Sequence, residues 1–485
     1  MTVPHFDWAG VATRLLLEHG FEPNFSKPAL NELSAIPESL PSPKTPTEDL
    51  RSLLWSSIDN ADSKDLDQIE YAETLPNGDI RVLVGVADVD ARVPQGTAID
   101  QRASQNTTSV YTGVMVFPML PEKLSTDLTS CNQDADRFAI IAEYIVQPTG
   151  DLGDYRAYPA LVRNRARLSY EEVAAFFDGD AEATAKIRSI PGLAEQLQLQ
   201  DTASKRLKTM RHHRGALEIE SSEARTVSKD GEVVGVEVVK KLRSRELVED
   251  FMIAANRVMA GELDRRGRQS IGRVVEKPKR WDRIMQLAQS VGEKLPAEPD
   301  AVALSEFMSR RRAADPEHFA DLSLAIVKSM GPGVYRLRRP GDPWPGHFGL
   351  AVQDYTHSTA PNRRFSDLVT QRLLKAALLE SPAPYDEASL AAVAQRCTEK
   401  ENDARKVERQ MRKVAMALLL RDRIGERFAA IVTGVTPKGT FVRLISPPAE
   451  GRVIRGEEGM DVGEQVEVKL LTTAPEKGFI DFVRA

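Results

Sequence analysis

The segment SIDNADSKDLDQIEYAETLPNGDIRVLVGVADVD, residues 57–90, joins a run of acidic side chains to a strand–turn–strand pattern. In its second half, apolar residues alternate from Ile80 to Val86, with further apolar residues on the opposite face. This pattern predicts a mostly buried strand. A Pro-Asn-Gly-Asp turn precedes it, so residues 67–75 and 80–87 are expected to form a β-hairpin.

Helical patterns dominate the middle of the chain, and strand patterns dominate its end. Apolar residues recur at helical spacing in four segments, 170–214, 246–263, 365–380 and 387–420. Together with the hairpin they predict an α+β fold for a large domain over residues 49–385, followed by a connecting helix over 386–423. Short β-rich runs separated by Gly and Pro turns then indicate five strands in residues 424–485, which predicts a small closed barrel of the OB type.

The first 48 residues predict a small front domain with two helices. Helical spacing indicates one helix over residues 8–18, and a second short helix is expected at 27–35. Residues 36–47 hold four prolines among polar residues, which is typical of a linker. The helix pair suggests a helix-turn-helix-like domain over residues 1–48, whose partner the sequence leaves unknown.

The composition is that of an ordinary soluble protein: 41% of the 485 residues are apolar, 28% are charged, and the net charge is −6. A slightly acidic total argues against nonspecific coating of nucleic acid, but not against RNA binding through local clusters of Lys and Arg. The two cysteines, Cys131 and Cys397, have no CxxC spacing, which fits a reducing compartment. Neither a signal peptide nor a membrane-spanning stretch is recognisable, so we expect a cytoplasmic protein without a membrane partner.

Four acids, Asp59, Asp62, Asp65 and Asp67, lie within nine residues. Carboxylates this close repel one another unless a positive charge lies among them, and a divalent cation supplies such a charge. Mg²⁺ prefers carboxylate oxygens and leaves positions for water and substrate phosphate, so the cluster indicates a site for phosphodiester hydrolysis.

Other interpretations of the acidic cluster compete with the metal site. A solvated acidic turn is the simplest alternative. A calcium loop of the EF-hand type requires Gly at its sixth position, where Lys64 stands, so that motif is excluded. A phosphatase with an aspartyl nucleophile would use Asp65 and Asp67, but the residues before them do not form a hydrophobic strand.

Six segments in order resemble the catalytic domain of RNase II/RNB-type exoribonucleases. They lie within about residues 50–380 and are IDNADSKDLDQ, VGVADVDARVPQGTAID, SVYTGVMVFPMLPEKLST, RGALEIESSE, ELVEDFMIAANRVMA and YTHSTAPNRRFSDLVTQR. The C-terminal barrel also resembles the RNA-binding OB module that closes many of these enzymes. The first 48 residues do not resemble the tandem cold-shock barrels of well-known members, so the front of the chain departs from the family.

The resemblance implies a role for each member of the acidic cluster. Asp59 and Asp65 match the family's metal-binding aspartates, and Asp67 matches the aspartate most directly tied to cleavage. The fourth acid of the family signature falls on Gln68, whose amide can offer a carbonyl oxygen to a metal but brings no charge. Asp62 is our hypothesis for a compensating acid.

The motif Ala-Pro-Asn-Arg-Arg at residues 360–364 matches the place where the family has an arginine at the scissile phosphate. The resemblance implies this role for Arg363, because a planar, permanently charged guanidinium neutralises phosphate oxygens as charge builds. Arg364 is a second catalytic candidate. The alternative is a surface pair of arginines that caps acids.

Four further residues match RNA-contacting positions. Tyr111 aligns with an aromatic that stacks on bases near the RNA 3′ end, and Phe441 lies where such barrels often present an aromatic to RNA. Tyr170 and Glu249 match positions that contact the terminal nucleotides and distinguish ribose from deoxyribose. The alternative for Tyr111 is an ordinary half-buried tyrosine of a strand, and the alternative for Glu249 is an ordinary charge on a helix surface. The second side of the base clamp falls near Ile219, which predicts one-sided stacking.

Basic clusters at residues 205–214, 310–312 and 336–339 are candidates for an RNA path, although charge runs are usually solvated surfaces. The resemblance thus implies a monomeric enzyme that hydrolyses single-stranded RNA stepwise from its 3′ end to nucleoside 5′-monophosphates. The expected cofactor is Mg²⁺, with Mn²⁺ as the alternative. Two other functions stay open. One is a catalytically weak RNB-fold protein that regulates by binding RNA, which Gln68 favours. The other is a metal hydrolase of small substrates, against which the predicted barrel argues.

Overall fold

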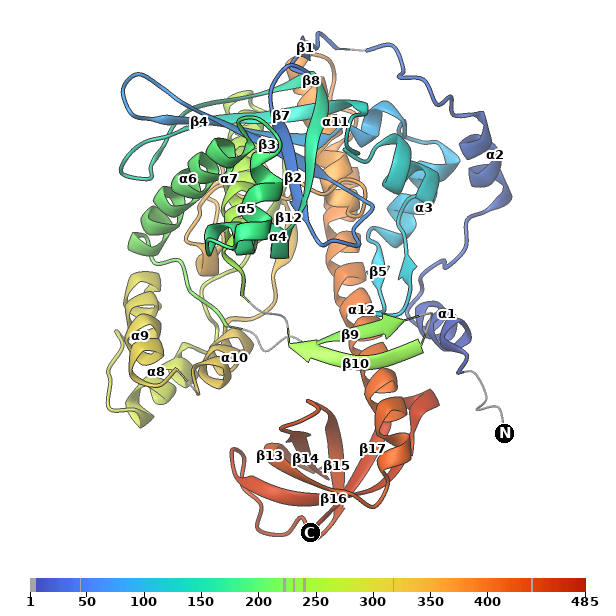
Figure 1. Ribbon diagram of the computed structural model, residues 1–485, viewed down its shortest axis with the longest axis vertical. Helices are drawn as coiled ribbons and strands as arrows, with labels where there is room; N and C mark the ends of the chain where they lie inside the picture. The colour runs from blue at the N-terminus through green and yellow to red at the C-terminus, as the bar shows by residue number, and fades with distance from the viewer. Residues whose placement is uncertain are drawn as a thin grey trace.

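The computed structural model describes residues 6–43, 45–220, 224–229, 232–238, 241–316, 318–437 and 439–485. Figure 1 shows a large body, a long helix that leaves it, and a small barrel at the far end of that helix. The predicted α+β fold class and the C-terminal β-barrel are both confirmed.

The body is built on one six-stranded sheet with the order β1-β8-β2-β3-β4-β7. Its strands are β1 (Glu48–Asp49), β2 (Trp55–Asp59), β3 (Gln68–Thr74), β4 (Ile80–Ala87), β7 (Asp136–Val146) and β8 (Leu152–Ser169). β3 and β4 form the predicted hairpin, in antiparallel register from Gln68 opposite Val86 to Thr74 opposite Ile80. The long strand β8 pairs antiparallel with β7 and, further on, parallel with β2. It therefore links β7, the last strand in this order, back to the other side of the sheet.

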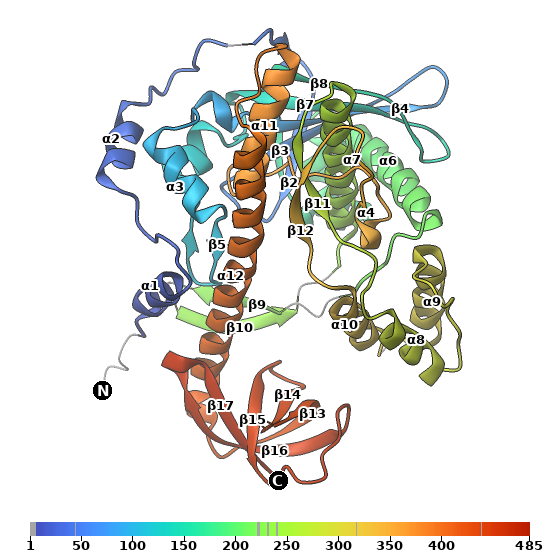
Figure 2. The same ribbon diagram turned by 180° about the vertical axis from the view of Figure 1, so that it is seen from behind.

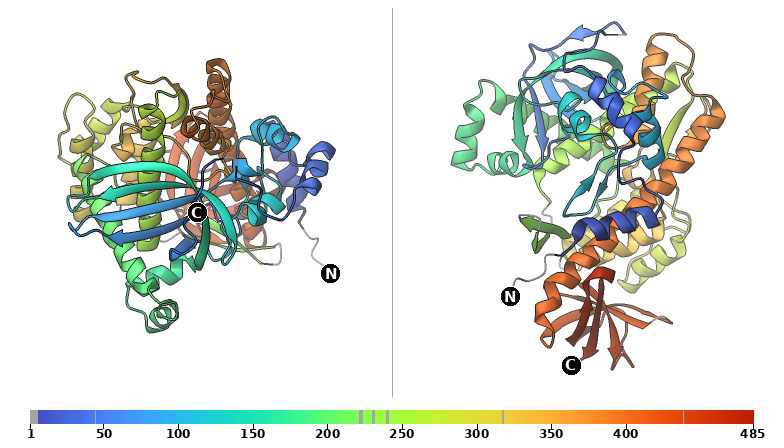
Figure 3. Two further views of the ribbon diagram at one scale, coloured as in Figure 1. Left: turned by 90° about the horizontal axis from the view of Figure 1, so that it is seen from above. Right: turned by 90° about the vertical axis from the view of Figure 1, so that its right-hand side faces the viewer.

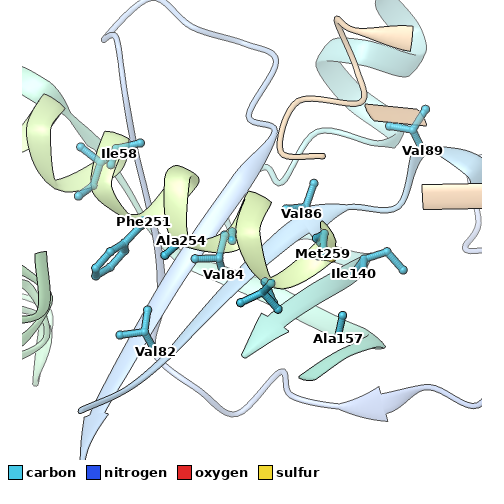
Figure 4. Close-up of a cluster of buried hydrophobic side chains, with 14 of the residues drawn as sticks. Ile58, Val82, Val84, Val86, Val89, Ile140, Ala157, Phe251, Ala254 and Met259 are labelled. Carbon is cyan, nitrogen blue, oxygen red and sulfur yellow. The ribbon is translucent and has the colours of Figure 1, made fainter. Parts of the chain in front are cut away.

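Helices cover one face of this sheet, and Figure 3 shows the blue and teal strands lying across the green helices. The helices of the body are α3 (Ala98–Asn106), α4 (Tyr170–Phe177), α5 (Ala181–Arg188), α6 (Leu193–His213), α7 (Arg243–Arg265) and α11 (Phe365–Leu378). Figure 4 shows Phe251 and Met259 of α7 among the buried residues Val82, Val84 and Ile140 of the sheet.

The opposite face of the sheet is also apolar. Leu83 of β4 packs there with Trp55 and Ile69 in a second buried cluster. Strand β4 is therefore buried on both sides, which is why its sequence is an almost continuous apolar run.

A small helical unit extends from the body, as Figure 2 shows from behind. It consists of α8 (Trp281–Ser290), α9 (Ala301–Ala314) and α10 (Phe319–Met330), which enclose their own apolar cluster around Ile284 and Phe307. The paired strands β11 (Ser270–Val274) and β12 (Val334–Arg338) lead into it and out of it. The remaining two-stranded sheets are β5 (Val110–Tyr111) with β6 (Val116–Phe117) and β9 (Ala224–Lys229) with β10 (Glu232–Val238).

Helix α12 (Glu387–Leu420) connects the body to the barrel, as predicted. The barrel strands are β13 (Arg427–Thr436), β14 (Gly439–Leu444), β15 (Glu450–Arg455), β16 (Gln465–Ala474) and β17 (Phe479–Arg484). They close in the order β13-β14-β15-β17-β16 around a core that includes Phe482, and Leu420 at the end of α12 packs against this core.

The two predicted front helices are present as α1 (Trp8–Glu18) and α2 (Lys27–Ala35), but they do not pack on each other as a helix-turn-helix pair. α1 packs against α12 through a cluster that includes Leu16 and Met411. α2 lies on α3, where Glu32 accepts a hydrogen bond from the backbone N–H of Ile99 at 3.2 Å. The helix-turn-helix interpretation is therefore corrected, because the apolar face of α1 covers α12 whereas that of α2 covers the body. In the described ranges, no helix has the length and apolar character needed to cross a membrane.

Candidate active site

The acidic segment forms the loop between two central strands. Asp59 is the last residue of β2, and Asp67 directly precedes β3, so both acids lie at the same end of the sheet. Arg167 donates to two carbonyl oxygens of the loop, at 2.6 and 3.2 Å. The hydroxyl of Ser130 bonds the backbone on both sides of Asp65, at 2.8 and 2.9 Å. These bonds hold the loop in a defined shape.

Asp67 is buried where two distant parts of the chain meet. Its Oδ1 accepts from the backbone N–H of Asn362 at 3.2 Å, and its Oδ2 accepts from Nε of Arg363 at 2.9 Å. Burial raises the pKa of Asp67 to about 7; the charge of Arg363 opposes this shift and that of Asp65 adds to it. Near neutral pH the carboxyl is thus balanced between its two protonation states, and a further cation would favour the ionised form.

The other two predicted metal-binding aspartates lie in the same loop. Oδ1 of Asp59 accepts from the N–H of Asn60 at 2.7 Å and from the hydroxyl of Ser63 at 2.9 Å. Burial still raises the pKa of Asp59, because these hydrogen bonds offset the loss of hydration only in part. Asp65 accepts from the hydroxyl of Tyr111 at 3.1 Å.

The two residues predicted at the margin of the metal site differ in burial. Asp62 is exposed in the loop, whereas Gln68 is 8% exposed as the first residue of β3. Asp62 is therefore a solvated acid, and its compensating role stays a prediction, as does the role of Gln68 as an amide ligand.

In the parts of the chain that the structure describes, no three His, Cys, Asp or Glu side chains are arranged to hold a metal ion by themselves. Mg²⁺ does not need such a cage, because it keeps several waters and is commonly bound by one or two carboxylates together with substrate phosphate. The donor set of Asp59, Asp65 and Asp67 has this chemistry, and burial raises the pKa of Asp59 and of Asp67, so a cation beside them would favour their ionised forms. These residues fit a hydrated Mg²⁺ or Mn²⁺.

The loop before α11 carries the two candidate arginines. The side chain of Arg363 is 42% exposed while it contacts Asp67, so part of its guanidinium is open to a substrate. Arg364 instead donates to Oδ1 of Asp367 at 2.6 Å. Asp367 is fully buried and also accepts from the backbone N–H of Ala360 at 2.8 Å, so it ties the loop together. The catalytic role of Arg364 stays a prediction, and its contacts favour a structural one.

The two predicted tyrosines border the aspartate loop. The ring of Tyr111 is exposed while its hydroxyl contacts Asp65. Tyr170 begins α4, and the guanidinium of Arg245 lies over its ring at 4.2 Å. Arg245 also donates to the side-chain oxygen of Asn60 at 2.8 Å, so it connects Tyr170 to the loop.

Glu249 and Phe441 lie outside this cluster. Glu249 is exposed on α7, and its charged neighbours include Arg211 and Lys241, so its role at the ribose stays a prediction. Phe441 is half-buried on β14, two residues before Arg443, which pairs with Asp321 of α10 at 3.2 Å. Side chains two residues apart share one face of a strand, so Phe441 lies on the side of the barrel that meets α10.

The predicted basic clusters are engaged in ion pairs with neighbouring acids. Their paired members are Lys205, Lys208, Arg211, Arg214, Arg310, Arg312, Arg336, Arg338 and Arg339. These contacts neutralise much of the charge, which favours the interpretation as ordinary solvated surfaces over a free lining for RNA.

Sequence reasoning missed three residues around the site, Arg167, Arg245 and Glu70. The two arginines hold the loop from positions more than 100 residues away, which only the folded chain reveals. Glu70 lies on β3 with a fully buried side chain, and burial, followed by the charge of Asp59, raises its pKa well above the usual value. Its strand, QIEYAET, also contains Gln68 and Glu73, so no local pattern in the sequence singles out Glu70.

Two family matches cover most of the chain: residues 47–380 match the RNB domain, and residues 426–485 match the RNase II-type exonuclease C-terminal S1 domain. Ribonuclease R 1 of Lactococcus lactis is 29% identical over 433 residues, which are 87% of this chain and 52% of that protein. Ribonuclease R of Aquifex aeolicus is 28% identical over 447 residues, 90% of this chain and 62% of that protein. The chain therefore spans between half and two thirds of the length of these relatives.

Solved structures share the fold. RNase R of Mycoplasma genitalium in complex with ribose-methylated single-stranded RNA superposes with a TM-score of 0.87 at 21% identity, covering 99% of this chain and 78% of that one. Yeast Ssd1, described as a pseudonuclease, superposes with a TM-score of 0.74 at 17% identity, covering 93% of this chain and 56% of that one. At these identities the likeness establishes the fold alone.

Proposed function

Because the chain belongs to the RNB domain family, we propose that it is an exoribonuclease that hydrolyses single-stranded RNA from the 3′ end to nucleoside 5′-monophosphates. The observation that carries this proposal is the contact of Asp67 with Arg363, 296 residues apart in sequence. It sets carboxylates suited to a divalent cation beside a guanidinium suited to phosphate. In phosphodiester hydrolysis, both kinds of group stabilise the negative charge that builds on the phosphate.

Asp59, Asp65 and Asp67 would hold the cation, Mg²⁺ or alternatively Mn²⁺. When bound, such an ion supplies positive charge to the phosphate and lowers the pKa of water. Arg363 has its Nε bound to Asp67, so the carboxylate orients the guanidinium and leaves the two terminal nitrogens to donate to phosphate oxygens. Asp67 changes protonation state near pH 7, so it is readily ionised when a cation binds.

Aromatic side chains supply the contacts that do not depend on base identity. The exposed ring of Tyr111 borders Asp65 and is available for stacking on a base near the reacting phosphate. We assign Tyr170 to the terminal nucleotides and Phe441 to the incoming strand. The M. genitalium RNase R of the same fold was solved with single-stranded RNA, which fits this assignment. We further propose that the protein acts as a monomer in the cytoplasm.

The test is incubation of the full chain with 5′-labelled single-stranded RNA and Mg²⁺ or Mn²⁺. We expect a ladder that shortens from the 3′ end, release of nucleoside 5′-monophosphates, and no cleavage of the matching DNA. Asp67→Asn should lower the rate by about 100-fold or more while RNA stays bound. The matched control is Asp79→Asn in the exposed hairpin turn, which should cleave normally. A fully active Asp67→Asn variant would refute the assignment.

The second candidate function is RNA binding with little or no hydrolysis. Gln68, which replaces a charged ligand with a neutral amide, is the observation that favours it, and the fold is shared with the pseudonuclease Ssd1. Intact RNA at every Mg²⁺ and Mn²⁺ concentration, together with normal RNA binding, would establish this candidate. Hydrolysis of a generic phosphomonoester with RNA left intact would instead indicate a metal hydrolase of small substrates.

A further inference from the structure

We propose that Glu70 is a further carboxylate ligand of the divalent cation and supplies the negative charge that Gln68 lacks. The inference rests on the proposed function, because it assumes that the aspartate loop binds a divalent cation. It assigns a role to a residue that the sequence motif does not contain.

Glu70 is the third residue of β3, two residues after Gln68. Side chains alternate between the two faces of a strand, so Gln68 and Glu70 point to the same face, about 6.6 Å apart along it. A glutamate is one methylene longer than an aspartate, so a carboxylate at Glu70 can lean along the strand toward the place that an acid at Gln68 would reach. Glu70 is also placed opposite Ser56 on β2, three residues before Asp59.

Among the described residues, the carboxylate of Glu70 has no hydrogen-bond partner. Both of its oxygens are buried. The hydroxyl of Ser56, its cross-strand neighbour, is likewise buried without a partner. A buried carboxylate without a compensating charge or hydrogen bond costs several kcal/mol, so such a group takes up a proton unless a positive charge lies beside it.

The other buried acids show how unusual this is. Within the described ranges, eight acidic residues are less than 10% exposed, and seven of them pair with a basic side chain: Asp67, Asp88, Asp100, Asp201, Asp250, Glu262 and Asp367. Glu70 is the exception. A cation bound at the aspartate loop would supply the positive partner that Glu70 lacks.

The other acid that could supply the missing charge lies in a different environment. Asp62, the other candidate for the missing charge, is exposed to solvent. A buried carboxylate is less screened than an exposed one and attracts the cation more strongly.

The test is the binding of Mn²⁺ to the full chain without RNA, measured by electron paramagnetic resonance and by the rise in melting temperature that the ion causes. Glu70→Gln keeps the shape of the side chain and removes its charge, and Glu73→Gln on the same strand is the matched surface control. Because loss of even an outer-shell partner of a metal lowers affinity by about 10- to 100-fold, we expect Glu70→Gln to weaken Mn²⁺ binding by at least 10-fold. Glu73→Gln should bind like the parent.

A rescue variant separates a ligand from a merely structural residue. Gln68→Asp in the Glu70→Gln background returns a carboxylate to the neighbouring position and should restore most of the lost affinity. Glu70→Asp, which keeps the charge but shortens the side chain, serves as a second probe if the amide disturbs folding, and should also weaken binding. Mn²⁺ affinity of Glu70→Gln within twofold of the parent would overturn the inference, as would a parent that binds no Mn²⁺.

The same measurements distinguish this inference from the proposed function. If the parent binds Mn²⁺ through Glu70 but leaves RNA intact, Glu70 is supported as a metal ligand and the proposed exoribonuclease activity is refuted. If the parent degrades RNA and Glu70→Gln binds Mn²⁺ with unchanged affinity, the exoribonuclease activity is supported and Glu70 is refuted as a ligand.

Discussion

Replacing Arg364 with alanine should mainly destabilise the protein, although this arginine is next to the one assigned to catalysis. Its guanidinium contacts Asp367, whose side chain is fully buried, while 23% of the Arg364 side chain is exposed. Removal of one partner from a buried ion pair costs about 3–5 kcal/mol. Asp367 would keep the N–H of Ala360 and the hydroxyl of Ser366 as donors, so we expect about 2–3 kcal/mol.

This loss corresponds to a fall in melting temperature of about 5 °C for a domain of this size. The measurement is thermal unfolding by circular dichroism at pH 7.5 in the presence of a chelator, with single-turnover cleavage of a short RNA on the same samples. The double variant Arg364→Ala/Asp367→Ala should recover part of the lost stability, because the unpaired buried charge is then absent.

The matched comparison is Arg363→Ala. Asp67 would lose an ion-pair partner too, but its pKa is already about 7, so it can take up a proton near neutral pH at a cost below about 1 kcal/mol. We therefore expect little change in melting temperature and a loss of about 100-fold or more in cleavage rate. If Arg364→Ala melted within 1 °C of the parent and yet abolished cleavage, the structural role of Arg364 would be wrong.

Three further outcomes are expected. Burial holds the pKa of His347 at about 4, so its contribution to stability is complete above pH 6.5 and is lost as the pH falls from 6.5 to 4. In urea denaturation, His347→Asn should reduce the acid-induced loss of unfolding free energy by on the order of 2 kcal/mol, and an unchanged loss would contradict this. Phe441→Ala should weaken binding of long single-stranded RNA by about 1–3 kcal/mol in fluorescence anisotropy, with the barrel still folded, whereas equal affinity would remove Phe441 from the RNA path. Gly150 has φ +88°, and an added Cβ would lie 2.1 Å from the carbonyl oxygen of Arg206. Gly150→Ala should therefore lower the free energy of unfolding, measured by chemical denaturation, by about 2 kcal/mol or more. Gly78→Ala, at a similar φ but in open space, is the control.

Most of the fold could be predicted from the sequence, because its elements are long and strongly patterned. The hairpin of residues 67–75 and 80–87 and the helix over 387–420 were confirmed closely, since alternation and helical spacing are local properties. The pairing of α1 with α12 was not predictable, because an apolar helix face does not specify which surface it covers. This is why the helix-turn-helix interpretation was wrong although both of its helices exist.

The candidate site was predictable to the extent that motif order carries spatial information. The ordered motifs predicted that Asp67 and Arg363 belong to one site, and the structure places them in contact. Arg245 and Arg167 could not be predicted, because their contacts with the loop depend on how α7 and β8 pack beside it. The contact between Arg364 and Asp367 could not be predicted either, because two adjacent arginines in a sequence do not reveal which acid each one contacts.

The aspartate loop should also couple cation binding to folding. Asp59 and Asp67 are buried carboxyls whose pKa is raised, so keeping them ionised without a cation costs free energy in the folded state. A cation that binds only the folded chain stabilises it in proportion to the logarithm of its concentration over its dissociation constant. Because Asp67 is joined to α11 through Arg363 and Asn362, the gain would stabilise the contact between β3 and the loop before that helix. The acids assigned to the cation site thus weaken the metal-free protein, and a bound ion would compensate for this loss.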